Sequence, residues 1–115
     1  MNKTYSLEKT DLFEKKFKKL IPDNKKTDIN RRIEALSESP YVGRPLGYAF
    51  LRELKLDKFR IYFFIYEKEI IVLLVNVSDK KAQKETIKRL KETQHIFYDL
   101  VQKNLNKTKP ENYNG

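Results

Sequence analysis

The sequence predicts an α+β fold: a small antiparallel sheet, an N-terminal helical hairpin packed on one face of it, and a long C-terminal helix. Three observations predict this fold. Apolar residues recur at helical spacing early in the chain, alternate with a period of two between Ala49 and Tyr66, and return to helical spacing beyond Asp79. The chain has 115 residues, which is enough for one domain with one modest core.

Two helices are expected after a short strand at Thr4 to Leu7. Thr10 or Asp11 can cap the first helix by accepting hydrogen bonds from the free amides of its first turn. A second helix is expected from about Lys25–Asp28 to Ser37, after a turn at 22–24. The apolar residues of the two helices are spaced by three and four positions, and the predicted buried set is Leu12, Phe13, Phe17, Leu20, Ile21, Ile29, Ile33 and Leu36.

Three strands are expected in the middle of the chain. Four backbone-breaking residues before them predict a loop, namely Pro40, Gly43, Pro45 and Gly47. The first strand then runs from Ala49 to a turn at 57–58. The second strand, 59–66, places Phe59, Ile61, Phe63 and Ile65 on one face and Arg60, Tyr62, Phe64 and Tyr66 on the other. After a turn near Glu67, the run 70–77 is apolar almost throughout, which is typical of a central strand.

The last element is predicted to be one helix of more than twenty residues. Ser78 or Asp79 can cap it, and its apolar stripe extends to Leu105. His95 lies midway along it with no motif partner, and we expect this histidine to be solvated. The single domain is expected to cover 1–105, and 106–115 is expected to be a disordered tail.

Composition excludes several classes of protein. Cysteine is absent, and one histidine alone cannot build a histidine-based metal site, so we expect neither a metal nor a cofactor. The glycines do not have the spacing of a nucleotide-binding loop. The N-terminus lacks the apolar core of a secretory signal, and we expect a cytoplasmic protein. A balance of 25 Lys and Arg against 16 Asp and Glu gives a net charge of +9, which favours a polyanionic partner.

Cations gather in the predicted sheet and just after it. They are Arg52, Lys55, Lys58, Arg60, Lys80 and Lys81. Like charges on neighbouring strands repel each other unless an anion lies between them, so the cluster indicates phosphate binding. Tyr62 and Tyr66 share the face of Arg60, where their rings could stack on unpaired bases. The alternative is that Arg60 forms a salt bridge with Glu53 and that the lysines only solvate the sheet.

The block from Arg52 to Lys81, RELKLDKFRIYFFIYEKEIIVLLVNVSDKK, resembles the sheet core of the RelE/ParE toxin superfamily. Its elements are a Leu-x-Leu strand, a short turn, an aromatic-Arg-Ile-x-aromatic strand, a charged hairpin, and an apolar strand that leads into a basic segment. The two preceding helices and the segment Arg44-Pro45-Leu46 also resemble the family.

The resemblance implies a type II toxin of the RelE-like branch. Such a toxin is an endoribonuclease (an mRNA interferase) that inhibits translation. It cuts messenger RNA in the ribosomal A site with the 2′-hydroxyl as nucleophile, and a cognate antitoxin neutralises it. By position, Lys55, Arg60, and Lys80 or Lys81 match the catalytic cations of the family. Arg52 and Lys58 are supporting candidates for gripping phosphate.

Two alternative functions remain besides the nuclease. One is a ParE-like inhibitor of gyrase, and the other is an inactive relative that binds RNA or acts in assembly. A homodimer is also an open alternative for the oligomeric state. RelE-like nucleases often carry a Tyr or His near the C-terminus as acid or base, whereas the comparable segment 81–90 has neither and offers only Thr86. Lys55, Glu53 or Tyr62 would then have to move the proton.

Overall fold

The computed structural model describes the backbone of residues 4–108 and the side chains of residues 4–104. The chain forms two compact units, which divide between Gln83 and Lys84. Among the described residues, no helix is both long enough and apolar enough to cross a membrane. The predicted extent of a single domain, 1–105, stays a prediction.

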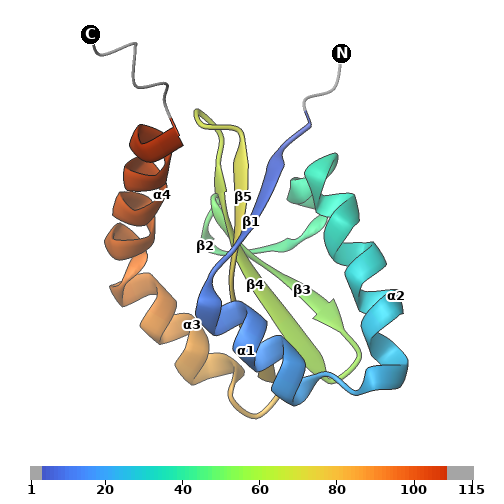
Figure 1. The fold of residues 1–115 in the computed structure, drawn as a ribbon. Helices are drawn as coiled ribbons and strands as arrows, with labels where there is room; N and C mark the ends of the chain where they lie inside the picture. Colours follow the sequence, from blue (N-terminus) through green and yellow to red (C-terminus); the bar gives the residue numbers. More distant parts are fainter. Residues whose placement is uncertain (1–3, 109–115) are drawn as a thin grey trace, which may run out of the picture. The chain divides into compact units, whose positions relative to one another are not determined.

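The first unit is built on a sheet of five strands. They are β1 (Ser6–Lys9), β2 (Arg44–Tyr48), β3 (Leu51–Leu56), β4 (Phe59–Tyr66) and β5 (Ile71–Asp79), and their order in the sheet is β1-β5-β4-β3-β2 (Figure 1). Along the chain from β2 to β5, each strand pairs antiparallel with the next one, whereas β1 pairs parallel with β5. The predicted α+β class with an antiparallel sheet is therefore confirmed.

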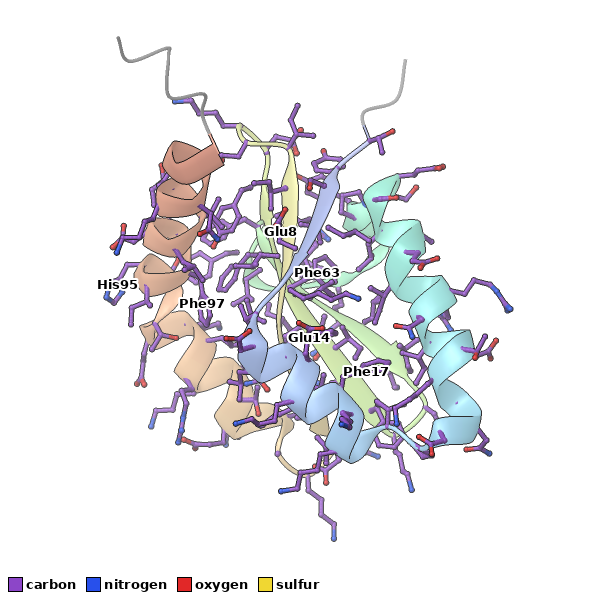
Figure 2. All side chains as sticks on the ribbon, viewed as in Figure 1. Glu8, Glu14, Phe17, Phe63, His95 and Phe97 are labelled. Atoms are coloured by element: carbon purple, nitrogen blue, oxygen red, sulfur yellow. The ribbon has the colours of Figure 1, made fainter. Side chains whose placement is uncertain are left out.

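Two helices cover one face of this sheet, α1 (Asp11–Leu20) and α2 (Asp23–Glu34) (Figure 1). Thr10 caps α1, since its hydroxyl accepts a hydrogen bond of 3.1 Å from the Phe13 amide, as predicted. The core between helices and sheet contains Phe63, with Phe17 packed against it (Figure 2). One expected core residue is wrong, because Leu12 is 46% exposed. The helical hairpin on one face is confirmed.

The alternation predicted for the second strand is confirmed in β4. Phe59, Ile61, Phe63 and Ile65 belong to the core that α1 and α2 cover. Tyr62 and Phe64, on the opposite face, are also fully buried. That face is therefore buried as well, although the sequence predicts tyrosine rings available for stacking there. The turn at 57–58 is where predicted, and Asp57 adopts the left-handed conformation there, with a φ of 62°.

Three expectations about the elements are corrected. The segment predicted as a loop contains β2, and two short 3₁₀ helices precede that strand, Ala35–Ser37 and Pro40–Val42. Pro45 and Gly47 are tolerated in β2 because it is an edge strand and its pairing is irregular between Pro45 and Tyr48. The first strand lies at Ser6–Lys9, two residues later than its predicted start. α2 begins at Asp23, directly after Pro22.

The C-terminal region is not one long helix. α3 (Gln83–Glu92) and α4 (Gln94–Thr108) are separated at Thr93, whose hydroxyl donates to the Arg89 carbonyl at 2.8 Å. The Thr93 amide also donates to the Arg89 carbonyl at 3.1 Å, and the Ile96 amide donates to the Thr93 carbonyl three residues back at 3.0 Å, the tighter spacing of a turn. α4 extends three residues into the predicted tail, 106–115, and the remainder of that tail lies outside the described residues.

Candidate active site

The register of the sheet brings the predicted cations to one end of it. Lys55 pairs across the strands with Arg60, and Arg60 pairs with Ser78. One position further, Phe59 pairs with Asp79, so the residues that follow β5 lie at the same end as the β3–β4 turn. We call this set the cationic end, and it comprises Lys55, Lys58, Arg60, Lys80 and Lys81.

Arg60 is the anchored cation of the cationic end. Its side chain is only 4% exposed, and its Nη1 donates to the carbonyls of Asp57 at 2.9 Å and Phe59 at 3.0 Å. Its Nε is buried and has no hydrogen-bond partner among the described residues. A buried N–H without an acceptor is costly, and the Nε edge of a guanidinium has the fork geometry that oxyanions fit. The turn thus holds Arg60 by Nη1, and a phosphate can reach the buried Nε only after neighbouring side chains move.

The lysines of the cationic end are exposed, unlike Arg60. Lys55, Lys58, Lys80 and Lys81 all lie at the surface. The Lys58 ammonium lies 5.6 Å from the centre of the Phe59 ring, which keeps it beside the β4 strand. The arrangement is therefore one buried guanidinium with several exposed ammonium groups at the same end of the sheet, and such a set stabilises a polyanion by charge.

Glu53 is the buried carboxylate on the same face, and it does not pair with Arg60. It is 2% exposed, its Oε2 lies 3.3 Å from Nε of Arg44, and the amide of Gln83 donates to both of its oxygens at 3.0 Å. The expected Glu53–Arg60 salt bridge is therefore wrong. Sequence reasoning missed Arg44 and Gln83 because Arg44 comes opposite Glu53 only when β2 pairs with β3.

Tyr62 cannot serve as a base near neutral pH. Its hydroxyl lies 2.8 Å from Oγ of Ser78, and Ser78 in turn donates to the Asp79 carbonyl, so the tyrosine is the donor of the pair. Burial raises the pKa of Tyr62 to about 12, against a lowering by the Ser78 hydrogen bond. The rings of Tyr62 and Tyr66 are 0% and 8% exposed, so neither presents a face on which a base could stack.

Arg52 lies on the other face of the sheet from Arg60. It pairs with Phe63, and its guanidinium donates to the carbonyls of Ala49 at 2.8 Å and Gly43 at 2.7 Å. It also lies over the ring of Tyr41, 4.9 Å from its centre. Arg52 therefore ties the edge of the sheet to the loop before β2, and its role in RNA binding stays a prediction.

Replacing Arg52 with alanine should lower the stability of the fold. We expect the free energy of unfolding to fall by about 1–3 kcal/mol, because the carbonyls of Ala49 and Gly43 lose a charged donor. Urea unfolding measures this quantity. An unchanged free energy of unfolding would contradict the structural role of Arg52.

The described residues contain no group of three His, Asp or Glu side chains that could hold a metal ion. His95 projects from α4 and is exposed, as the sequence predicts (Figure 2). Thr86, in the segment where the resemblance calls for a Tyr or His, is a buried residue of α3.

No family model matches the chain, and no curated protein matches it. The chain has an α+β fold, in which a five-stranded sheet carries two helices on one face and cations at one end. Among solved structures, it is similar to a free mutant of the E. coli toxin RelE, with a TM-score of 0.62 and 17% identity, covering 75% of this chain and 92% of that one.

Two complexes have the same fold. The E. coli RelE mutant bound to a peptide of the antitoxin RelB has a TM-score of 0.58 and 17% identity, covering 72% of this chain and 94% of that one. The toxin–antitoxin complex RelBE2 of Mycobacterium tuberculosis has a TM-score of 0.56 and 22% identity, covering 66% of this chain and 98% of that one. The chain has a RelE-like fold, as the sequence predicted.

Proposed function

We propose that this chain is the toxin of a type II toxin–antitoxin pair and that it cleaves messenger RNA on the ribosome without a metal ion. The observation that carries the proposal is the register that sets Lys55 directly opposite Arg60, a guanidinium held in place by the β3–β4 turn, with the exposed Lys80 and Lys81 at the same end of the sheet. A guanidinium fixed in this way binds a phosphate in two parallel hydrogen bonds and loses little entropy in doing so.

The proposed reaction is an attack by the 2′-hydroxyl oxygen on the adjacent phosphorus. The bond from phosphorus to the 5′-oxygen breaks, which leaves a cyclic phosphate and a 5′-hydroxyl. Arg60 stabilises the negative charge that develops on the phosphorane oxygens, and Lys80 and Lys81 add positive charge at the same end. The proton of the 2′-hydroxyl must pass to a base, and the leaving oxygen must gain one.

We assign one of the two proton transfers to Lys55: its ammonium donates a proton to the leaving 5′-oxygen, and water accepts the proton of the 2′-hydroxyl. Of the three side chains that the sequence leaves for this role, Tyr62 is buried and protonated. Both oxygens of Glu53 accept hydrogen bonds from Gln83, and Glu53 is also paired with Arg44. Lys55 is exposed and lies directly opposite Arg60. Lys58 is assigned to gripping the RNA backbone.

The proposed partners are the ribosome with its messenger RNA, and a cognate antitoxin. Similarity to RelE toxins that were solved with RelB antitoxins supports the antitoxin. The net charge of +9 suits both an RNA and an acidic antitoxin. With these partners, the proposed location of the protein is the cytoplasm.

A second candidate is a RelE-like protein that binds RNA without cutting it. Thr86 favours this candidate, because a threonine hydroxyl is a poor acid or base where the resemblance calls for a Tyr or His. A ParE-like inhibitor of gyrase needs no phosphate-stabilising site, so the orientation of Arg60 weighs against it.

Induction of the protein without its antitoxin tests the proposal. We expect growth arrest and new RNA 5′ ends within translated codons, mapped by sequencing before and after induction. Absence of both arrest and new ends would overturn the proposal in favour of the non-cutting relative. Arrest with DNA-damage signalling and no new ends would instead support gyrase inhibition.

A further inference from the structure

Glu53 is a buried carboxylate to which the proposed reaction gives no role. Its side chain is 2% exposed, so its charge has lost most of its contact with water. The amide of Gln83 donates to both of its oxygens at 3.0 Å, and Nε of Arg44 lies 3.3 Å from Oε2. Burial of a charge costs free energy that its partners only offset, so net stability does not account for this arrangement.

Gln83 connects Glu53 to the turn that follows β5. We call residues 79–83 the lysine turn, because it carries Lys80 and Lys81, and we call the contact between Gln83 and Glu53 the clasp. The first residue of the turn, Asp79, is the last of β5, and Gln83 reaches Glu53 within β3. Since β4 lies between β5 and β3 in the sheet, the lysine turn spans the width of β4.

Both ends of the lysine turn lie on the face of the sheet that carries Arg60. Ser78, which precedes the turn, pairs with Arg60, and Glu53 pairs with Tyr62. Tyr62 shares the face of Arg60 because it is two residues further along β4. The clasp therefore holds the lysine turn on the face of the sheet where the phosphate is proposed to bind.

The backbone of the lysine turn has local hydrogen bonds as well. Oδ1 of Asp79 accepts from the Ala82 amide at 2.9 Å, and the Lys80 carbonyl accepts from the Gln83 amide at 3.4 Å. These two bonds set the shape of the turn, but they join it to neither β3 nor β4. Lys80 and Lys81 are exposed. The tie from the lysine turn to β3 is therefore the clasp.

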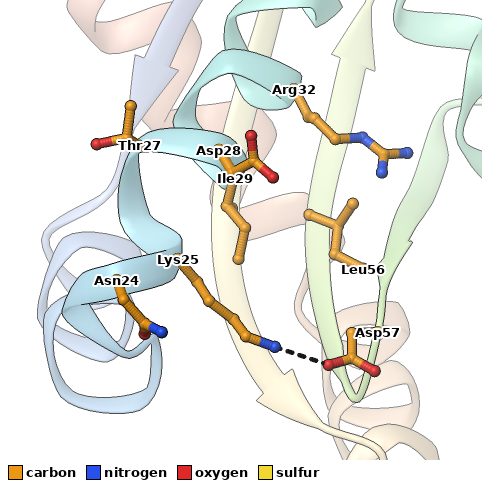
Figure 3. Close-up of a pocket in the computed structure, with 8 residues that line it drawn as sticks. All are labelled: Asn24, Lys25, Thr27, Asp28, Ile29, Arg32, Leu56 and Asp57. Carbon is orange, nitrogen blue, oxygen red and sulfur yellow. Dashed lines mark hydrogen bonds and ion pairs between the residues drawn. The ribbon is translucent and has the colours of Figure 1, made fainter.

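The β3–β4 turn, at the same end of the sheet, is tied to α2 in a different way. Asp57 of this turn forms an ion pair of 2.9 Å with Lys25 of α2, and both residues line a pocket of about 360 Å³ (Figure 3). Their side chains are 67% and 42% exposed, so water and salt screen the pair, which contributes little. The buried Glu53 carboxylate is much less screened, so the clasp is the stronger tie.

We propose that Glu53 and Gln83 are positioning residues for RNA cleavage, an inference that rests on the proposed function. They act by holding the lysine turn, so that Lys80 and Lys81 lie where negative charge develops on the phosphorane. Charges held in place before the reaction stabilise a transition state without the cost of ordering them during it. Glu53 neither gives nor takes a proton in this role.

The test measures RNA cleavage by the full chain in a reconstituted translation reaction, with each rate normalised to folded protein. Gln83→Ala should lower kcat about tenfold, the size of one hydrogen bond to a charged group, and change KM less than about twofold. Gln94→Ala is the matched control, because the Gln94 amide donates only to the nearby Lys91 carbonyl. It should cleave at the rate of the parent protein.

A background without the two lysines separates positioning from a general structural effect. In the Lys80→Ala/Lys81→Ala protein, Gln83→Ala should lower kcat by less than about twofold, because the groups that it positions are already absent. A full tenfold loss in this background would overturn the proposal, and so would an unchanged kcat when Gln83→Ala is made in the parent protein.

Glu53→Gln is the conservative variant, since its amide oxygen still accepts a hydrogen bond from Gln83. We expect it to retain more activity than Gln83→Ala. A loss of about 100-fold or more would be the loss expected for a group that transfers a proton, and it would overturn the positioning role of Glu53.

Amide hydrogen exchange tests the clasp without any cleavage. Gln83→Ala should speed exchange at the Ala82 amide about tenfold, because the turn then opens more often. Unchanged exchange would overturn the inference even if the parent protein cuts RNA. Absence of cleavage by the parent protein would overturn the proposed function itself, and the exchange result tells the two failures apart.

Discussion

Replacing Arg60 with alanine is expected to reduce ribosome-dependent RNA cleavage by about 100- to 1000-fold, the usual effect of removing a preorganised donor to a developing oxyanion. The size of the effect follows from its fixed position. Arg60 is 4% exposed and is held by two backbone carbonyls, so no solvated lysine can take its place. The measurement is the rate at which new 5′ ends appear in a reconstituted translation reaction.

Arg60→Lys separates charge from geometry. Lysine keeps the positive charge but lacks the planar fork, so we expect a loss of at least about tenfold if the Nε edge binds phosphate in two bonds. Arg31→Ala is the control for net charge, since it removes a guanidinium whose side chain is 73% exposed on α2. It should cleave at the unchanged rate.

Arg60 also supports the β3–β4 turn, so its variants need a test of folding. Thermal unfolding and the amide spectrum of each variant show whether the sheet is intact. Full cleavage by a folded Arg60→Ala protein would contradict the proposed role of this residue. Equal activity of Arg60→Lys and the parent protein would show that charge alone is needed.

Replacing Phe63 with alanine is expected to lower the free energy of unfolding by about 3–5 kcal/mol, since a large ring is removed from a core that collapses only in part. Phe63 is 0% exposed and lies in the core between α1, α2 and the sheet. Urea unfolding provides the measurement. Leu12→Ala is the control, because Leu12 is 46% exposed, and it should change stability by less than about 0.5 kcal/mol.

Gly43 gives this prediction a second and more specific test. A Cβ added at Gly43 would lie 2.7 Å from Cζ of Phe63 and 3.0 Å from the carbonyl oxygen of Glu53. Gly43→Ala should therefore destabilise the fold by about 1–3 kcal/mol through overpacking. In a Phe63→Leu background the first clash is relieved, so the cost of Gly43→Ala should fall. A double-mutant cycle that finds the two substitutions additive would rule out this contact as the cause.

Much of the fold was predictable because local patterns are simple. The period-two alternation over 59–66 placed Phe63 in the core and Arg60 on the opposite face, and β4 has this arrangement. The strand β2 was not predictable in the same way, because Pro45 and Gly47 are typical of loops. An edge strand tolerates such residues, and only pairing with β3 reveals it.

The candidate site divides in the same way. The positions of Lys55 and Arg60 on neighbouring strands follow from the alternation and a tight turn, both visible in the sequence. Their environments do not follow from it. Glu53 is paired with Arg44, which belongs to a different strand, β2, that the sequence pattern does not reveal. The ring of Tyr62 is buried instead of facing solvent.

The sequence by itself determined the α+β class, the resemblance to RelE toxins and the concentration of cations on the hairpin, because each of these depends on spacing along the chain. Only the tertiary structure decided which groups are buried, which hydrogen bonds are occupied, and that the β3–β4 turn holds the Arg60 guanidinium by Nη1. Burial and hydrogen bonding depend on residues far apart in the sequence, and no local period encodes those contacts.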